Sequence, residues 1–435
     1  IYAIDVASGG LSGLSQLPHC GGVALADPEV TGRILDHVET AIRERRSRFE
    51  AVGAADLREH NHLAAGDDRL PWLLLLIDGW DLLHEEAQTT AGSALHDRIL
   101  RLLADGQRFG VQGVVAGDRW VVSGKAGRMV AHRYVLRFNS DVDYDTTGLR
   151  ASQVPEEMPS GRALGEGGRL HQVAVLGDGT GPGQAEALRE MAAGLQAAAA
   201  DVPPARRPRR VQSLPTKVML DDLIAEAPPI AGKVPVLIGV SSASGGPLWV
   251  DLATEARGFV VAGARRSGRS TALLALAESA RRAGVSVVAL CPRPSPLRQL
   301  DGRPGVVAVY ADDRAATAAL AEVADLERVL VVADDIDQLE PSHLGLAALV
   351  AAPHAGRAIV VAATIEGAKN QVSGFLPALR RQRSGMLLCP TSVFDGGALG
   401  GGNLPRHLLF DQPEGRAVLS LGGDHGIVQV GFAGG

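Results

Sequence analysis

A glycine-rich segment between an apolar run and an amphipathic run carries residue types that can hold a phosphate group. It has the spacing of a phosphate-binding loop, with Arg269 where such a loop usually has lysine. Glycines let successive backbone N–H groups curl around an anion, and the helix that follows directs its positive N-terminus at the same point. The alternative is a strand–helix turn that binds nothing. The residues expected to line the site are Gly263, Ala264, Arg265, Arg266, Ser267, Gly268, Arg269, Ser270 and Thr271.

Four side chains have distinct expected roles around the phosphate. Arg269 supplies positive charge, although its planar guanidinium is bulkier than the ammonium of lysine and is not an equivalent replacement. Ser270 would ligate Mg²⁺, and Asp334, which ends the apolar run Val329–Ala333, would hold the water shell of the metal. Asp335 takes the position of a catalytic base that is usually glutamate, so its shorter side chain predicts slow hydrolysis. For both carboxylates, the alternative is a strand-end aspartate that only caps the next helix.

Two other strand ends are further candidates. Thr364 follows the apolar run Ala358–Ala363, where it is either a sensor of the terminal phosphate or an ordinary residue at a strand end. The apolar run Leu73–Ile77 ends in Asp78 and Gly79, so it repeats the carboxylate but has glycine where the base would stand. We therefore expect poor hydrolysis beside Asp78 even with a nucleotide bound there.

These candidates all follow short apolar runs, and the runs alternate with amphipathic helical stretches. A continuous apolar run bounded by glycine and aspartate is typical of a strand buried on both faces, and therefore of a largely parallel sheet between helices. Ligands bind such sheets at the carboxyl ends of the strands. The sequence predicts an α/β fold with strands at Phe259–Ala262, Val285–Leu290, Val329–Ala333 and Ala358–Ala363, and a helix at Ala272–Arg282.

An internal repeat extends this pattern to the first half of the chain. Ile1–Val23 matches Val285–Val306, with Gln16 on Gln299 and Gly22 on Gly305 at one offset of 283 (299 − 16 and 305 − 22). The other matches follow in the same order: 72–83 with 329–340, 110–120 with 356–366, and two Pro-x-Gly-Arg motifs at 159–162 and 413–416. Because the echoes keep one order, they indicate two related modules.

The repeat sets the predicted domain boundaries. The first module is expected at residues 1–195 and the second at 217–435, joined by a Pro- and Arg-rich linker at 196–216. Projecting Arg269 back by the repeat offset places the phosphate loop of the first module before Ile1. We therefore expect the first module to be truncated at its N-terminus and to lack its own phosphate loop.

Two groups of arginines are candidates for contacts with partners. The linker carries Arg206, Arg207, Arg209 and Arg210, which either touch phosphate or an acidic partner or simply face water. One amphipathic helix is expected between Asp27 and His62, and it carries Arg43, Arg45, Arg46 and Arg48. One of these four acts in trans as an arginine finger or binds an acidic partner, or all four form a solvated face balanced by nearby glutamates.

The composition excludes several classes of protein. The chain has 435 residues, of which 46% are hydrophobic and 21% charged, so it can bury large cores and is not a disordered tail. No apolar run approaches the ~18 residues that cross a bilayer, and nothing near Ile1 resembles a signal peptide. The net charge of −6 argues against a nucleic-acid binder. Cys20, Cys291 and Cys389 are too scattered for a disulfide framework or a zinc ribbon and suit a reducing cytosol.

Taken together, the motifs resemble those of the FtsK/SpoIIIE group of RecA-like P-loop motor ATPases. The resemblance is carried by GARRSGRST (263–271), VLVVADD (329–335), LLLLIDGW (73–80), Leu17-Pro18-His19 and the two Pro-x-Gly-Arg motifs. The tandem degenerate modules resemble in particular the actinobacterial EccC-type ATPase of type VII (ESX) secretion and related proteins with a forkhead-associated domain. The resemblance covers nearly the whole chain except the linker, and it implies two RecA-like P-loop NTPase modules.

The same resemblance implies a function. It implies ATP and Mg²⁺ at Gly263–Thr271, Asp334 and Asp335, a hexamer, and transport of protein or DNA within a complex at the inner face of the membrane. We expect the chain to be the cytosolic motor part of a type VII secretion ATPase with weak hydrolysis. The alternative is a binding module that has lost turnover and recognises a secretion substrate or another protein. A DNA translocase is least favoured, because it would want a basic channel.

Overall fold

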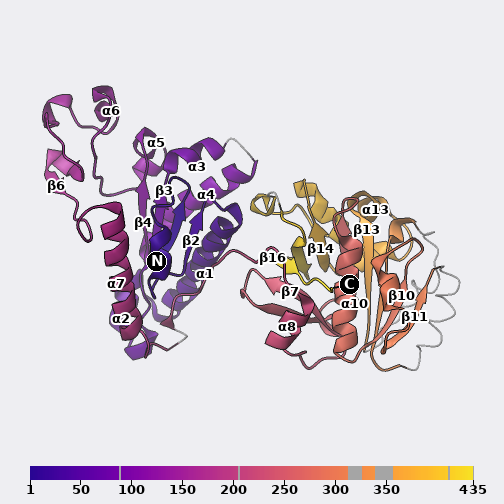
Figure 1. Ribbon diagram of the computed structural model, residues 1–435. Helices are drawn as coiled ribbons and strands as arrows, with labels where there is room; N and C mark the ends of the chain where they lie inside the picture. Colours follow the sequence, from indigo (N-terminus) through magenta and orange to yellow (C-terminus); the bar gives the residue numbers. More distant parts are fainter. Residues whose placement is uncertain (88–89, 204–205, 312–325, 339–355, 410–411, 435) are drawn as a thin grey trace. The chain divides into compact units, whose positions relative to one another are not determined.

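The computed structural model describes residues 1–87, 90–203, 206–311, 326–338, 356–409 and 412–434. It divides into two compact units, Ile1–Ser213 and Leu214–Gly435, each with its own hydrophobic core. In each unit, helices lie beside a sheet that is parallel wholly or in part (Figure 1). The α/β fold class predicted from the alternation of apolar and amphipathic stretches is therefore confirmed.

Unit 1 is built on a parallel sheet with the strand order β2-β1-β3-β4. Its strands are β1 (Tyr2–Asp5), β2 (Gly22–Leu25), β3 (Leu73–Asp78) and β4 (Val111–Ala116). Its helices are α1 (Pro28–Val52), α2 (Leu57–Leu63), α3 (Trp80–Glu86), α4 (Thr90–Asp105), α5 (Arg119–Ser123), α6 (Asp141–Thr146) and α7 (Gly181–Ala198). A separate antiparallel hairpin is formed by β5 (Arg162–Leu164) and β6 (Leu170–Gln172).

The segment predicted as one helix between Asp27 and His62 forms two helices, α1 and α2. The carboxylate of Asp27 caps the start of α1 by accepting hydrogen bonds from the backbone N–H groups of Glu29 and Val30. The chain leaves α1 at Gly53, whose φ of 70° is left-handed and ends the helix. Asp56 then caps α2, so a glycine stop signal followed by an aspartate start signal explains the break that we did not predict.

Unit 2 is built on a larger sheet with the strand order β11-β10-β12-β13-β9-β14-β15-β16-β7-β8. The half from β11 to β14 is parallel, and the half from β14 to β8 is antiparallel. Its strands are β7 (Pro235–Ser241), β8 (Pro247–Asp251), β9 (Gly258–Gly263), β10 (Ser286–Leu290), β11 (Val306–Tyr310), β12 (Val329–Ala333), β13 (Arg357–Thr364), β14 (Gly385–Leu388), β15 (Arg416–Leu421) and β16 (Asp424–Val430). The antiparallel half is a feature that the sequence patterns did not predict.

The helices of unit 2 cover a sheet whose central strands are fully buried. The α-helices are α8 (Leu220–Glu226), α9 (Leu252–Glu255), α10 (Arg269–Arg282), α13 (Ile365–Asn370) and α14 (Leu376–Arg380). Short 3-10 turns include η8 (Pro296–Leu300), η10 (Ile336–Gln338) and η11 (Val393–Leu399). Helix α10 packs across β7, β9, β10, β12 and β13, so it links the phosphate-loop strand to its neighbours (Figure 1).

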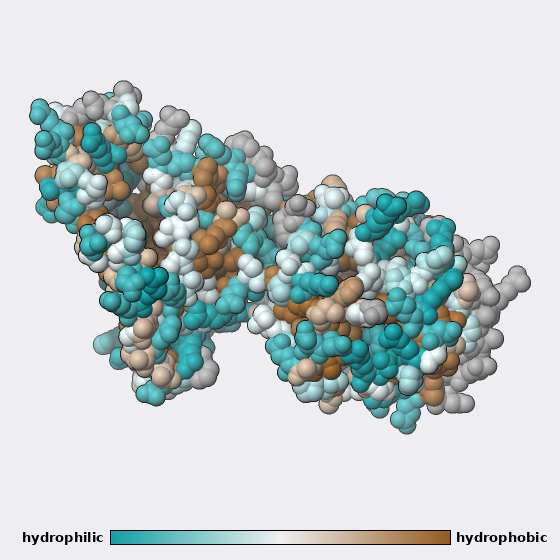
Figure 2. All heavy atoms as spheres, in the orientation of Figure 1, coloured by the Kyte–Doolittle hydropathy of each residue, from teal (hydrophilic) through white to brown (hydrophobic). Residues whose placement is uncertain are grey.

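The repeat predicted from the sequence has the same strand order in both units. The order β2-β1-β3-β4 of unit 1 corresponds to β11-β10-β12-β13 of unit 2. The described residues of unit 1 contain no counterpart of β9 or α10, and apolar residues reach the surface of this unit (Figure 2). Val114 on β4 is 51% exposed, whereas Val360, at the corresponding place on β13, is fully buried. Unit 1 therefore lacks, among its described residues, the elements that carry the loop in unit 2.

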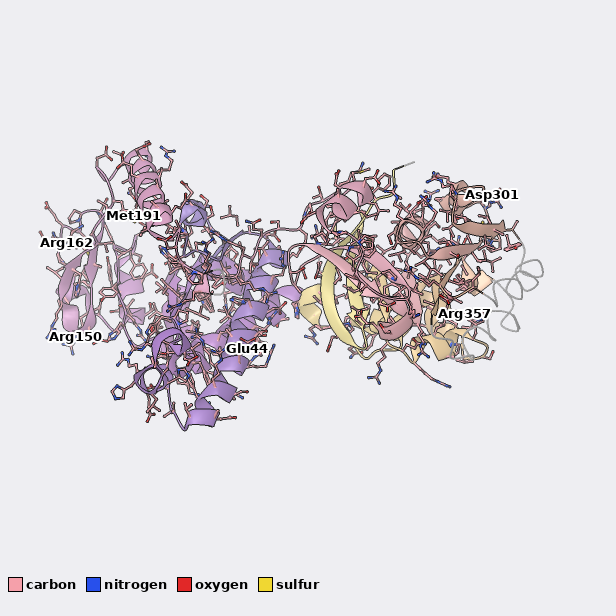
Figure 3. The ribbon with its side chains drawn as sticks, turned by 90° about the horizontal axis from the view of Figure 1, so that it is seen from below. Glu44, Arg150, Arg162, Met191, Asp301 and Arg357 are labelled. Carbon is pink, nitrogen blue, oxygen red and sulfur yellow. The ribbon has the colours of Figure 1, made fainter. Side chains whose placement is uncertain are left out.

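The two Pro-x-Gly-Arg motifs fold alike. The arginine Nε donates to a glutamine Oε1 on the antiparallel partner strand, from Arg162 to Gln172 at 3.0 Å and from Arg416 to Gln429 at 2.9 Å (Figure 3 labels Arg162). Each glutamine Nε2 donates back to the carbonyl oxygen of the residue before the glycine. The glycines Gly161 and Gly415 have φ values of 76° and 74°, a conformation that favours glycine. The motif thus joins the start of one strand to its antiparallel partner through an arginine–glutamine pair, which we call a clamp.

The segment 196–216 predicted as a linker has ordered contacts at its end. The hydroxyl of Tyr2 donates to the carbonyl oxygen of Arg209 at 2.9 Å, and the side chain of Val211 is 5% exposed in unit 1. In unit 2, Arg416 donates to the carbonyl oxygens of Leu214 and Pro215 at 3.1 and 3.2 Å. The side chains of Arg206, Arg207, Arg209 and Arg210 are exposed, while residues 204 and 205 lie outside the described chain.

None of the helices that the structure describes combines the length and the apolar character that crossing a membrane requires.

Candidate functional site

The loop between β9 and α10 bends at two glycines. Gly263 ends β9, and a Cβ atom there would collide with the hydroxyl of Ser267 and lie 3.1 Å from the backbone oxygen of Leu388. Gly268 precedes α10 with a φ of 93°, which glycine adopts without strain, and a Cβ atom there would meet open space. The N-terminus of a 14-residue helix therefore points into an open, glycine-lined turn.

The predicted loop residues differ in exposure. Ala264, Arg265, Arg266 and Gly268 are exposed, whereas Ser267, Arg269, Ser270 and Thr271 are half-buried. The hydroxyl of Ser267 is buried and has no hydrogen-bond partner among the described residues. An orphaned hydroxyl within a glycine cradle is a fit for the oxygens of a phosphate group.

Arg269 folds back across the loop instead of extending into water. Its Nη1 donates to the carbonyl oxygen of Gly263 at 2.8 Å, and its Nη2 lies 3.1 Å from Oδ1 of Asp335. The side chain of Arg269 is 10% exposed and that of Asp335 24% exposed. The structure thus brings together two residues that the sequence proposed separately, as a phosphate-binding cation and as a base.

Asp334 lies in a closed position at the end of β12. It is 2% exposed, and its Oδ1 accepts a hydrogen bond from the backbone N–H of Asp335 at 2.9 Å. Its Oδ2 accepts from the hydroxyl of Ser295 at 2.7 Å, so among the described residues its hydroxyl partner is Ser295 rather than the loop residue Ser270. Two donors therefore fix the orientation of the Asp334 carboxylate.

The environment of Asp335 makes its carboxyl group harder to ionise than a carboxyl group in water. Burial raises the pKa of Asp335, and the nearby charge of Asp334 raises it further, while Arg269 and Arg293 oppose the shift. The backbone of Asp335 is also unusual, because its φ of 47° is left-handed for a residue with a side chain. A held, partly buried carboxyl group at a strand end is a pattern that occurs at functional sites.

Thr364 sits beside the loop but is engaged elsewhere. In the sheet its Cα pairs with that of Gly263, so β13 brings it next to the loop. Its hydroxyl donates to Oδ2 of Asp337 and accepts from the backbone N–H of Gly367 at 2.9 Å, which caps α13. These contacts are those of the ordinary strand-end threonine that we considered beside the sensor.

The corresponding place in unit 1 has a different surface. Asp78 ends β3, and the next residue, Gly79, has a φ of 81°. A Cβ atom on Gly79 would lie 2.9 Å from Cγ2 of Val6 and 3.0 Å from the backbone nitrogen of Ala7. Any larger residue, including a catalytic base, would therefore clash at this position.

The arginines expected on one solvated helix face separate into two groups. Arg43, Arg46 and Arg48 are exposed on α1. Arg45 is 5% exposed and donates to the carbonyl oxygens of Phe109 and Pro71, each at 2.6 Å. The prediction of a solvated face is wrong for Arg45, because its guanidinium is buried and replaces water as the donor to two carbonyl groups.

Two residues near the site were missed by sequence reasoning. Ser295 and Arg293 belong to the loop after β10, which approaches Asp334 and Asp335 because β10 and β12 are parallel neighbours. The available signal was the position of polar residues at the carboxyl end of a predicted strand, Cys291-Pro-Arg-Pro-Ser295. Within the described chain, no three histidine, cysteine or acidic side chains form a metal site by themselves.

Comparison with known proteins relates this chain to secretion ATPases. The ESX-4 secretion system protein EccC4 of Mycobacterium tuberculosis is 30% identical over 279 residues, which are 63% of this chain and 21% of that protein. The ESX secretion system protein EccC of Thermomonospora curvata is 27% identical over 281 residues, 62% of this chain and 20% of that protein. The chain thus spans about a fifth of the length of these curated relatives. No family model matches it.

Solved structures share its fold. EssC (ATPases 2 and 3) from Geobacillus thermodenitrificans has a TM-score of 0.66 at 16% identity, with 100% of this chain and 85% of that chain covered. EccC (ATPases 2 and 3) from Thermomonospora curvata, in complex with a signal sequence peptide, has a TM-score of 0.57 at 20% identity, with 100% and 82% covered. At these identities the likeness shows the tandem P-loop ATPase fold alone.

Proposed function

We propose that this chain is a nucleotide-binding part of a type VII secretion motor. The premise is that its homologues are EccC and EssC type VII secretion ATPases. The homology confirms the resemblance to EccC that the motifs predict. ATP binds in unit 2, at the loop Gly263–Thr271, and the protein works in the cytoplasm at the inner face of a membrane, within a larger assembly.

One observation supports the nucleotide site most directly. The glycine-lined turn, the start of α10 and the orphaned hydroxyl of Ser267 converge at the carboxyl ends of β9 and β12, where Asp334 and Asp335 also lie. Backbone N–H groups and the helix N-terminus hold the phosphates there, while Arg269 contributes charge.

The residues also fit a magnesium ion held jointly with the phosphates. Magnesium prefers few protein oxygens and keeps several waters, which suits the hydroxyl of Ser270 and the fixed carboxylate of Asp334. When bound, the ion would neutralise charge on the phosphate oxygens. Ser270 would contact it directly, and Asp334 would hold its waters.

We expect hydrolysis to be slow. Asp335 would act as the base, but its carboxyl group is paired with Arg269, so it accepts a proton only after Arg269 has turned toward the phosphate. ATP therefore stays bound for a long time before it is hydrolysed.

Calorimetric titration of the purified chain with ATP and Mg²⁺ tests the site. Gly268→Asp places a negative charge in the turn and should weaken binding at least ~10-fold, the scale of losing one charge-assisted contact. Gly245→Asp is the matched control, since Gly245 also has a positive φ and open space around its Cβ position but lies between β7 and β8. Equal affinity in wild type and Gly268→Asp would refute the site, as would nucleotide bound beside Asp78.

A second candidate function is recognition of a secretion signal peptide by unit 2 without turnover. A relative is known in complex with a signal sequence peptide, and here two apolar side chains stand out in the contacting segments around α13 and η11. Phe394 is 63% exposed and Val372 is 85% exposed. Apolar residues at such exposure are typical of places where an apolar peptide face binds.

Fluorescence anisotropy with a labelled signal peptide, in EDTA and without nucleotide, separates the two functions. Phe394→Ser should weaken the peptide complex ~10-fold if this surface binds it, as expected for removing a buried aromatic anchor. Val307→Ser on β11 removes another exposed apolar side chain and serves as control. Identical peptide affinities for wild type and Phe394→Ser would exclude this surface.

A further inference from the structure

We propose that Ser295 is a positioning residue of the nucleotide site, which fixes the carboxylate of Asp334 that faces the metal. This inference rests on the proposed ATP and magnesium site of unit 2. Ser295 acts through Asp334 and touches neither the phosphates nor the ion.

The carboxylate of Asp334 is held at both oxygens. The hydroxyl of Ser295 donates to Oδ2 at 2.7 Å, and the backbone N–H of Asp335 donates to Oδ1 at 2.9 Å. The residue is 2% exposed, so water does not provide substitute hydrogen bonds freely. Two donors on different oxygens set the rotation of the carboxyl plane, which one donor alone would leave free.

Ser295 reaches this place because of strand pairing. Leu290, at the end of β10, pairs in parallel register with Ala333, at the end of β12, and the backbone N–H of Asp334 donates to the carbonyl oxygen of Leu290 at 2.9 Å. The residues that follow the two strands therefore lie side by side.

The loop that carries Ser295 is also stiff. Pro292, Pro294 and Pro296 alternate with the functional side chains, and each proline fixes its own φ. Ser295 is the N-cap of η8, where its hydroxyl accepts from the backbone N–H of Leu297 at 3.3 Å. One hydroxyl thus accepts from the turn and donates to the carboxylate, so its direction is fixed from both sides.

Among the residues of unit 1 that the structure describes, no such pair occurs. Asp5, at the end of β1, occupies the strand end that corresponds to Cys291, and its carboxylate accepts from the backbone N–H groups of Ala7, Gly9 and Leu11. That loop is therefore held by its own carboxylate and delivers no donor to Asp78 within the described hydrogen bonds. The serine–aspartate pair occurs in the unit that has the phosphate loop.

The test measures ATP affinity by calorimetry in Mg²⁺ and again in EDTA, for the full chain. Ser295→Ala should weaken binding ~10-fold in Mg²⁺, the lower end of the cost of removing a group that orients a metal-site residue, and leave the affinity in EDTA unchanged. Ser295→Thr keeps the hydroxyl and should restore the affinity to within twofold. Ser392→Ala is the control, because Ser392 also caps a 3-10 turn, η11, through a backbone N–H, but does not face Asp334.

A second readout is independent of ligand. Hydrogen exchange of the Asp335 amide should accelerate in Ser295→Ala, because a turning carboxylate no longer holds that N–H, and should stay slow in Ser392→Ala. An equal loss of ATP affinity in Mg²⁺ and EDTA, or no loss at all, overturns the positioning role. If wild type binds no nucleotide under either condition, the proposed ATP site itself fails, and the positioning role fails with it.

Discussion

Nη2 of Arg269 lies 3.1 Å from Oδ1 of Asp335, so the cation that we propose for phosphate binding and the carboxyl group that we propose as the base are paired with each other. The same guanidinium donates to the carbonyl oxygen of Gly263 at 2.8 Å. A phosphate that enters the turn must therefore compete with both acceptors. This pairing connects two positions where the chain departs from the usual residue type, and it sets the expected outcome of changing either one.

Arg269→Lys should bind ATP more tightly than wild type, by ~1 kcal/mol, or about fivefold, the scale of one improved charge-assisted hydrogen bond. A compact ammonium group reaches the β- and γ-phosphates without spanning the turn to both Gly263 and Asp335. Arg269→Ala should bind more weakly than wild type. Calorimetry in Mg²⁺ decides it: wild type that binds at least as tightly as the lysine variant would mean that Arg269 is an adapted phosphate ligand.

Asp335→Asn should bind ATP about threefold more tightly than wild type, because the variant lacks the charge that holds Arg269 and repels phosphate. Asparagine tolerates the left-handed backbone, so the loop keeps its shape. Turnover should fall below detection, since the amide cannot accept a proton as a base does. Weaker ATP binding by Asp335→Asn would show that Arg269 is not restrained by this pair.

Asp335→Gly should leave unit 2 more stable than Asp335→Ala by ~1 kcal/mol, the cost of a left-handed residue with a Cβ atom. Both variants lose the ion pair with Arg269, so the comparison isolates the backbone at φ 47°. Urea denaturation measures both free energies of unfolding. An alanine variant as stable as the glycine variant would mean that this backbone relaxes to negative φ.

The stability of unit 1 should fall as the pH drops below 6.5. Burial lowers the pKa of His96 from 6.5, and the neighbouring His84 lowers it further. Between the pKa of His96 in the unfolded chain and its lower pKa in the folded chain, the unfolded chain binds more protons. Acid therefore favours unfolding. Trp80 contacts His96 with ring centroids 5.0 Å apart, so urea denaturation can be followed by tryptophan fluorescence at pH 7 and pH 5.

His96→Gln should remove much of this pH dependence, because glutamine does not titrate. The exposed His62 supplies the control variant His62→Gln, which should keep the pH dependence of wild type. Identical pH profiles for wild type and His96→Gln would place the acid sensitivity elsewhere.

Arg416→Ala should destabilise unit 2 by ~3 kcal/mol, because Arg416 is 2% exposed and its removal leaves several buried acceptors without a donor. Arg162→Ala breaks the equivalent bond to Gln172 in the half-buried motif of unit 1 and should cost less than ~1 kcal/mol. Denaturation of the two variants side by side measures the contrast. Equal costs would show that burial does not set the strength of this clamp.

Contiguous patterns in the sequence predicted a large part of the fold. The predicted strand Val329–Ala333 has the same bounds in the structure, and the predicted phosphate loop lies between a strand and a helix. Both predictions depend on neighbours in the chain, where an apolar run or a glycine spacing decides the local backbone. The contact between Arg269 and Asp335 could also have been predicted, because the carboxyl ends of parallel strands share one edge of the sheet.

Other contacts depend on which distant strands and helices become neighbours. Ser295 reaches Asp334 only because β10 lies next to β12, and no motif contains both residues. Arg45 could have been placed inside, since it follows Ile42 by three positions and precedes Phe49 by four, on the apolar face of α1. We predicted Arg45 to be exposed because it is charged. A guanidinium can nevertheless be buried where carbonyl groups accept its hydrogen bonds.

The left-handed backbone shared by Gly79 and Asp335 has a consequence for how such modules diverge in their genes. An aspartate codon becomes a glycine codon by one transition at its second base, and at this position the exchange relieves backbone strain. Loss of this carboxyl group is therefore a single mutation, in which relief of the backbone offsets part of the lost ion pair with Arg269. In unit 1, the reverse change from glycine to aspartate would place a Cβ atom against Val6 and Ala7, which pack around Gly79. Related modules should therefore lose this carboxyl group more often than they regain it.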